Sequence, residues 1–208
     1  MRKAIFVGLA VALIGSRVSA QSPSPQANQG GAYYQFLLGL HLESEGDAKG
    51  AAAAYEAAEK LDPQSAEIPA ALAALYARTN RATDAVTAGE RAVKVDPENQ
   101  EANWILGNLY SRMVESPNTR NQDRAGYAQK AIASLERADS NAHPAVPVML
   151  GRLYLETRQF DKSISLLLPL IAEEPDQIEA IALLAEAYQS TGHGCSTRSS
   201  RTNHPRTQ

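Results

Sequence analysis

Residues 72–110 read LAALYARTNRATDAVTAGERAVKVDPENQEANWILGNLY and contain one full period of a sequence repeat. The pair Leu72-Ala73 returns one period later as Leu106-Gly107, and a tyrosine follows each leucine at the fourth position. Leucine and tyrosine four residues apart lie on one face of a helix, which predicts an apolar stripe that must be buried. The small residue beside each leucine would let a second helix approach closely.

The same period runs through most of the chain. The leucine and its small neighbour recur as Leu38-Gly39, Leu72-Ala73, Leu106-Gly107, Leu150-Gly151 and Leu184-Ala185. The large apolar residue four positions after each leucine is Leu42, Tyr76, Tyr110, Tyr154 or Tyr188. The spacing between successive leucines is constant except between Leu106 and Leu150, where it is longer, so one unit exceeds the others in length.

A second segment of each unit has its own pattern. Alanines recur at helical spacing, as at Ala51 and Ala58, and a proline such as Pro63 closes most units. The proline breaks the helix, and the aspartate that precedes it favours a turn. Each unit is therefore predicted to be a helix, a short turn, a helix and a stop. One such pair cannot bury its apolar face alone, so successive units are expected to stack.

This pattern resembles the tetratricopeptide repeat family over about residues 32–192. In unit one the motif residues are Leu38, Gly39, Leu42, Ala51, Tyr55, Ala58 and Pro63. The resemblance implies an all-α fold, an α-solenoid of antiparallel helix pairs wound into a right-handed superhelix. We expect four complete pairs and a fifth first helix. The units span about 32–65, 66–99, 100–143, 144–177 and 178–192.

The third unit is about ten residues longer than the others. Its first helix should end near Glu115, where a proline follows, and its second should begin near Asp123 and run through Ala138. One interpretation makes residues 112–124 a binding loop. The other is a tolerated loop with a longer second helix, because each doubling of loop length costs only ~0.6 kcal/mol. The second interpretation is favoured.

The N-terminus has the features of a cleaved export signal. Arg2 and Lys3 precede an apolar run that ends at Ile14, and small residues lead to a cleavage point after Ala20. The run is about ten residues long, whereas a bilayer span needs ~20, so no stable membrane insertion is expected after cleavage. We expect a signal peptide at 1–20 and an exported protein, either periplasmic or secreted.

The two segments that flank the repeats are polar. Residues 21–31 are rich in Gln, Ser, Pro and Gly and predict a flexible linker. Residues 193–208 contain almost no apolar side chain and predict a disordered tail. The fifth first helix would then be uncovered. This indicates either a C-terminally truncated repeat protein or a surface for a partner or for self-association.

The charge distribution makes nucleic acid an unlikely partner. Of 20 basic residues, six lie in 1–20 and 196–208, which leaves 14 basic against 23 acidic side chains in between. An acidic surface repels polyphosphate backbones. The single cysteine and four histidines show no metal-ligand spacing, and no catalytic motif occurs. No cofactor, metal or catalytic residue is expected.

In the tetratricopeptide repeat family the first helices line a concave groove that holds the partner. The matching positions in this chain are Tyr33, Phe36, Glu67, Arg78, Trp104, Asn108, Arg112, Arg152 and Glu156. Trp104, Asn108 and Arg112 are four residues apart and project from one face, where an aromatic, an amide and a guanidinium suit a peptide. The alternative, equally supported, is that Trp104 packs against a neighbouring unit and Arg112 pairs with an acid.

These observations predict a protein- or peptide-binding scaffold that acts outside the cytoplasm and is not an enzyme. The alternative is the repeat segment of a larger enzyme, such as a glycosyltransferase or kinase, whose catalytic domain is not in this sequence. The repeat pattern itself does not decide between them, because its motif residues are structural.

Overall fold

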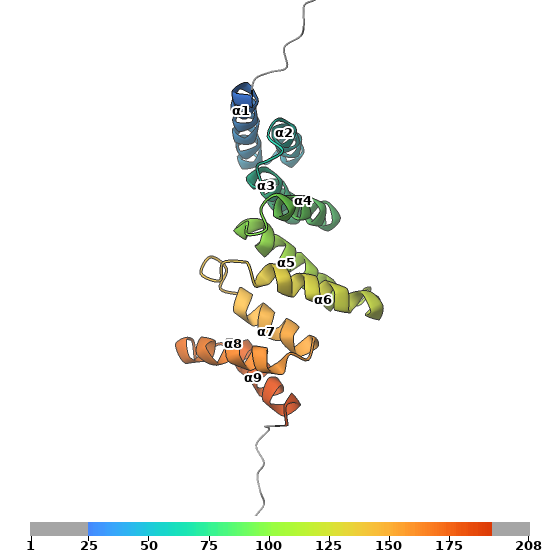
Figure 1. The fold of residues 1–208 in the computed structure, drawn as a ribbon, viewed down its shortest axis with the longest axis vertical. Coiled ribbons are helices and arrows are strands. Elements are labelled where there is room, and N and C mark those ends of the chain that lie inside the picture. Colours follow the sequence, from blue (N-terminus) through green and yellow to red (C-terminus); the bar gives the residue numbers. More distant parts are fainter. Residues whose placement is uncertain (1–24, 193–208) are drawn as a thin grey trace, which may run out of the picture.

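The computed structural model describes residues 25–192, which form nine α-helices and no strand (Figure 1). The helices are α1 (Pro25–Ser44), α2 (Ala48–Leu61), α3 (Glu67–Arg78), α4 (Ala82–Val95), α5 (Gln100–Glu115), α6 (Asn121–Leu135), α7 (Val146–Glu156), α8 (Phe160–Glu173) and α9 (Ile178–Ser190). Consecutive helices pack as four pairs, and α9 is a fifth first helix. The expected all-α array is confirmed over this range. The expected signal peptide and C-terminal tail lie outside the described residues.

The apolar core runs along the array as a series of clusters, one after another, and has no single centre. This is the arrangement expected when each unit packs mainly on its neighbours. Of the helices between residues 25 and 192, none is long and apolar enough to cross a membrane.

Small residues allow the two helices of a pair to touch. A Cβ atom added to Gly39 would lie 2.5 Å from the Tyr55 ring, and one added to Gly107 would lie 2.5 Å from Leu135. Tyr55 and Leu135 are almost completely buried and have no space into which to move. The small residue beside the repeated leucine is therefore explained by the close approach of the second helix.

The turn inside most units uses a residue with a left-handed backbone. Gly46 and Gly192 have φ angles of 83° and 73°, while Asn80 and Arg158 have φ angles of 59° and 60°. Gly46 and Asn80 occupy the same position of successive units, as do Arg158 and Gly192, so the same turn recurs in register. Glycine and asparagine accept this conformation readily. In unit three α5 continues through this register as far as Glu115.

The extra residues of unit three do not lie where the sequence suggested. α5 has 16 residues against 12 in α3, whereas α6 has 15 against 14 in α4. α6 begins at Asn121 and ends at Leu135, so Ala138 lies in the connection 136–145. The second helix is therefore only one residue longer than α4 and ends three residues before the expected Ala138, and most of the extra residues lie in α5 and in the connection 136–145. In that connection the Asp139 side chain accepts a hydrogen bond from the Asn141 backbone N–H at 2.8 Å, a local turn that competes with helix.

The first helix begins earlier than expected. Residues 25–31 belong to α1 and not to the flexible linker predicted over 21–31. Proline suits the first turn of a helix, because its missing N–H would have no partner there. A Cβ atom added to Gly31 would lie 3.3 Å from Leu61 of α2, and Ala32 is buried. Packing against α2 therefore overrides the low helix propensity of the glycines.

A repeated hydrogen bond joins each of the first three units to the unit that follows it. The donor hydroxyl and acceptor carboxylate are Tyr76 and Glu56 (3.0 Å), Tyr110 and Glu90 (2.6 Å), and Tyr154 and Glu136 (2.7 Å). A cation lies over each ring, with Arg81, Lys130 and Lys162 at 4.2, 5.0 and 5.1 Å from the respective centroids. Burial, helped by the bond to Glu90, raises the pKa of Tyr110 to about 12. The hydroxyl thus remains a donor at ordinary pH and orients the joint.

Candidate functional site

Neighbouring first helices are unevenly spaced. α3 packs closely against α5, and α7 packs closely against α9. Few backbone atoms come close to each other between α1 and α3 or between α5 and α7. A pocket lies at each of the two wider spacings. They are named here the α1–α3 pocket and the α5–α7 pocket.

The α5–α7 pocket brings together four of the groove residues predicted from the sequence. Asn108 and Arg112 come from α5, and Arg152 and Glu156 come from α7. Each pair is four residues apart, so helical spacing turns both side chains toward the same space. The volume is about 180 Å³. The remaining lining residues are Ser111, Val114, Glu115, Met149 and Leu153.

Arg152 links three successive first helices. Its Nη1 donates to Glu115 of α5 at 2.5 Å, and its Nη2 donates to Glu179 of α9. The hydrogen bond with Glu115 raises the pKa of Arg152 above its ordinary value. Because two carboxylates surround this guanidinium, Arg152 fixes the shape of the pocket and brings little free charge to a ligand.

Arg112 and Glu156 differ from Arg152. Within residues 25–192, neither side chain lies within 4.0 Å of an opposite charge. Both side chains are exposed at the pocket. The pocket therefore offers one guanidinium, one carboxylate and the amide of Asn108 to whatever enters it. Such a set can bind the polar backbone of a peptide together with side chains of either sign.

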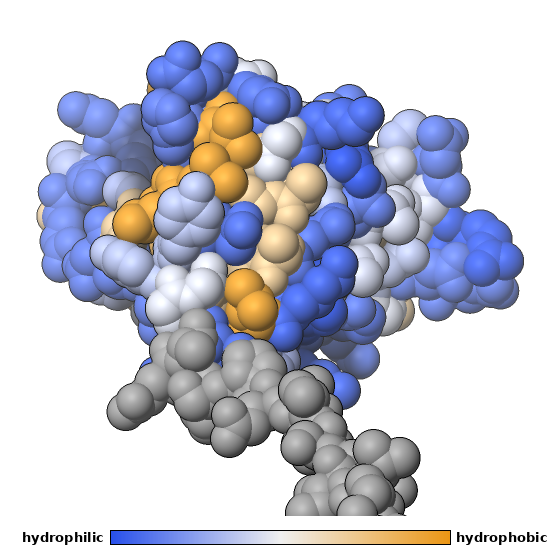
Figure 2. Space-filling model, turned by 90° about the horizontal axis from the view of Figure 1, so that it is seen from above, coloured by the Kyte–Doolittle hydropathy of each residue, from blue (hydrophilic) through white to orange (hydrophobic). Residues whose placement is uncertain are grey.

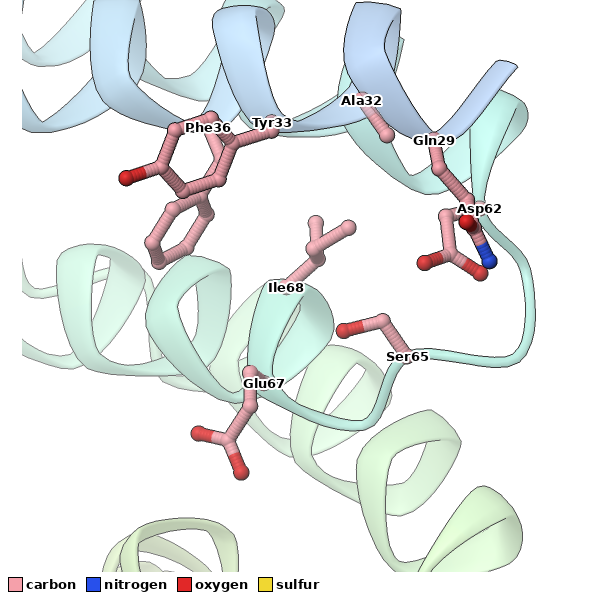
Figure 3. Close-up of a pocket in the computed structure, with 8 residues that line it drawn as sticks. All are labelled: Gln29, Ala32, Tyr33, Phe36, Asp62, Ser65, Glu67 and Ile68. Atoms are coloured by element: carbon pink, nitrogen blue, oxygen red, sulfur yellow. The ribbon is translucent and has the colours of Figure 1, made fainter. Parts of the chain in front are cut away.

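The α1–α3 pocket is larger and more apolar, with a volume of about 410 Å³. Figure 3 shows the rings of Tyr33 and Phe36 at one end, Gln29 and Asp62 at the other, and Ile68 between them. Ala32, Ser65 and Glu67 complete the lining. The carboxylate of Glu67 points away from α1 and accepts a hydrogen bond from Asn99 at 3.0 Å.

The structure gives packing or pairing roles to the other predicted groove residues. Trp104 is half-buried and stacks on His143, with ring centroids 4.2 Å apart and an interplanar angle of 9°. His143 belongs to the third unit, as Trp104 does, so this stacking is packing within one unit. Arg78 forms an ion pair with Glu43 of α1. For Arg112 the alternative was an acidic partner, and the described part of the chain provides none within 4.0 Å.

Several pocket residues were not found from the sequence. Glu115 and Met149 lie off the four-residue stripe, and Asp62 and Ser65 lie in the turn between α2 and α3. The repeat register does carry a signal for Ser65, since Asn99 stands at the same position of the next unit and is buried. Because Ser65 is smaller than the buried Asn99, the difference indicates open space between α1 and α3.

Over residues 25–192, no group of three or more His, Cys, Asp and Glu side chains is arranged to hold a metal ion. The two pockets are lined by groups suited to binding by contact and hydrogen bonding.

Sequence comparison agrees with this architecture. Residues 26–66 and 70–112 match one family model described as tetratricopeptide repeat, and residues 124–193 match a second model of the same description. Together the matched ranges cover well over half of the chain. No curated protein matches the sequence.

Solved structures show the same fold. The crystal structure of the MamA protein is 25% identical and superimposes with a TM-score of 0.60, covering 78% of this chain and 84% of that protein. A second MamA crystal structure is 26% identical, with a TM-score of 0.57 and coverage of 76% and 86%. A tetratricopeptide repeat protein from Parabacteroides merdae is 19% identical, with a TM-score of 0.54 and coverage of 80% and 61%, and shows the fold alone.

Proposed function

Because the chain belongs to the tetratricopeptide repeat family, we propose that it is a protein-interaction scaffold that binds a peptide segment along its first helices. Proteins of this family bind other proteins or peptides. The family does not specify the partner, so the proposal for this chain depends on its own surface.

The observation that carries the proposal is the α5–α7 pocket. Two helices present the four predicted groove side chains to it, and Arg152 is held in place by Glu115 and Glu179. Arg112 and Glu156 lie in the same pocket and have no opposite charge within 4.0 Å in the described chain. Charged groups with rigid surroundings and no internal partner are suited to pairing with a ligand.

The proposal includes action outside the cytoplasm. It is supported by the sequence of residues 1–20, where two basic residues, an apolar run and small residues follow one another. Mass spectrometry of the protein secreted from a host should then find Gln21 as its first residue. Recovery with Met1 retained would count against export.

The binding proposal predicts a specific loss when Arg112 is replaced by alanine. A peptide is first selected on the full chain from a random peptide library, and its affinity is then measured by fluorescence anisotropy. We expect the Arg112→Ala variant to bind that peptide about tenfold more weakly, which corresponds to about 1.4 kcal/mol, because it loses a charge-assisted contact. Far-UV circular dichroism should be unchanged, since Arg112 is exposed.

Arg120→Ala is the matched control. Arg120 is also an exposed arginine of unit three, but it pairs with Asp123 at 2.7 Å and lines neither of the two pockets. The control should bind like the wild type. Equal affinity of Arg112→Ala and wild type would remove the α5–α7 pocket from the proposed site.

A further inference from the structure

The residues around the α1–α3 pocket differ from those at the same repeat positions farther along the array. The contact region between two successive first helices is called a joint here, so that α1–α3 is the first joint, α3–α5 the second and α5–α7 the third. Ser65 and Tyr33 of this joint occupy the same repeat positions as Asn99 and Glu67 of the next. There the Asn99 amide donates to Glu67 at 3.0 Å, and only 5% of Asn99 is exposed. Ser65 is too short to reach Tyr33 in this way. The first joint therefore lacks the hydrogen-bonded Asn–Glu pair that fills the second joint.

The apolar residues also differ between the two joints, since large side chains in the first joint correspond to alanines in the second. Phe36 and Ile68 correspond to Ala70 and Ala102, which are 1% and 0% exposed and pack together. In the third joint the residue matching Phe36 is Trp104, which is covered by His143. Only the first of these three joints combines a large aromatic residue with an uncovered pocket.

The pocket continues into an exposed apolar surface on α1. Figure 2 shows apolar side chains gathered on this end of the molecule. On α1, Leu37 and Leu40 are each 44% exposed, and Tyr33 and Tyr34 are 66% and 64% exposed. Contiguous exposed apolar surface of this kind marks an interaction site in proteins of ordinary composition.

Charge indicates the kind of partner. No lysine or arginine lines the pocket, while Asp62 lies at one end of it (Figure 3). Residues 25–66 contain two lysines against six acidic residues. Arginines of the next unit pair with two of these acids, Glu43 and Glu59. The other four acidic residues still outnumber the two lysines, so the first unit keeps a net negative charge. An anionic membrane surface or a second copy of this acidic unit would meet like charge.

We propose that the α1–α3 pocket anchors a large apolar side chain of a partner protein, in a segment where lysine or arginine flanks that side chain. The apolar side chain would lie between Phe36 and Ile68. A flanking cation would face Asp62 or the exposed ring of Tyr33, since cations are attracted to both carboxylates and aromatic faces. This inference rests on the scaffold function and names the partner chemistry of the α1–α3 pocket.

The test uses the full chain and a blocked, fluorescein-labelled peptide with one phenylalanine between lysines. Two control peptides replace either the phenylalanine by serine or the lysines by glutamate. The lysine–phenylalanine peptide should bind at least tenfold more tightly than either control by fluorescence anisotropy, and it should shift the methyl signal of Ile68 in NMR spectra. Equal binding of the three peptides overturns the proposal.

The repeat itself supplies the decisive variant. Ser65→Asn introduces at the first joint the amide that fills the second, and it should lower the affinity for the lysine–phenylalanine peptide about tenfold. The control Ser140→Asn, at an exposed serine in the connection 136–145, should leave that affinity unchanged. Tyr33→Ser removes an exposed ring without disturbing the core and should also weaken binding. Unchanged affinity in both pocket variants overturns the proposal.

Two further outcomes separate this inference from its alternatives. If the chain self-associates in sedimentation and Ser65→Asn abolishes that association, the occupant is a second copy and the proposal is overturned. Arg112→Ala should leave binding of the lysine–phenylalanine peptide intact. Loss of binding in Arg112→Ala but not in Ser65→Asn would support the scaffold function and overturn the assignment of this pocket.

Discussion

Replacement of Tyr55 by alanine should unfold the first helix pair while the rest of the array stays folded. Tyr55 is 0% exposed, and its ring lies against Gly39 and 5.6 Å from the ring of Phe36. Its hydroxyl donates to Glu43 at 2.9 Å. Truncation of a fully buried aromatic residue costs about 3–5 kcal/mol, and here it also removes one of the two donors to Glu43, the other being Arg78.

The loss should be local because each unit of a solenoid packs mainly on its neighbours. Hydrogen exchange measured by mass spectrometry should show α1 and α2 exchanging rapidly, with α7 and α8 still protected. The α1–α3 pocket would be lost, and the α5–α7 pocket retained. Tyr34→Ala is the matched control, because Tyr34 is a tyrosine of the same helix pair, on α1, and is 64% exposed. Equal loss of protection in all helices of the array would contradict this account of local stability.

Alanine at Gly107 and alanine at Gly126 should change stability in opposite directions. An added Cβ at Gly107 would lie 2.5 Å from Leu135, whereas at Gly126 it would meet nothing within 4 Å. Overpacking of this kind costs about 1–3 kcal/mol, while glycine to alanine at an open helical position stabilises by about 0.5–1 kcal/mol. Urea unfolding followed by circular dichroism gives both values. Stabilisation by Gly107→Ala would show that α5 and α6 are not in close contact.

Much of the fold follows from the sequence because its determinants are local. The leucine, its small neighbour and the aromatic residue define the buried face of each first helix within five residues, and the turn residues recur at the same register. The extent of α1 was not evident, because the polar, glycine-containing residues 25–31 have low helix propensity and the approach of Gly31 to Leu61 of α2 is a long-range contact. The end of α6 was also misjudged, since the helix ends at Leu135, before the turn around Asp139, and does not reach Ala138.

The candidate site was only partly predictable for a related reason. Helical spacing placed Asn108 with Arg112, and Arg152 with Glu156, on single faces. The spacing between neighbouring first helices depends on long-range contacts, so the sequence did not reveal which joints would be open. Arg152 binds Glu115 and Glu179, 37 and 27 residues away in the chain, and such pairs leave no local pattern. Trp104 was assigned to the groove face with Asn108 and Arg112 from helical spacing alone. Its stacking on His143 could not be foreseen, because the connection 136–145 sets the position of that residue.

The central claim is that partners bind along the first helices, and site-specific photo-crosslinking to the library-selected peptide tests it most directly. The crosslinker replaces Leu40 of α1 or Asn108 of α5 in turn, and Ala53 of α2 or Ala133 of α6, both exposed on second helices, in the controls. The account predicts crosslinked peptide from at least one first-helix position and from neither control position. Crosslinks only from Ala53 or Ala133 would contradict it.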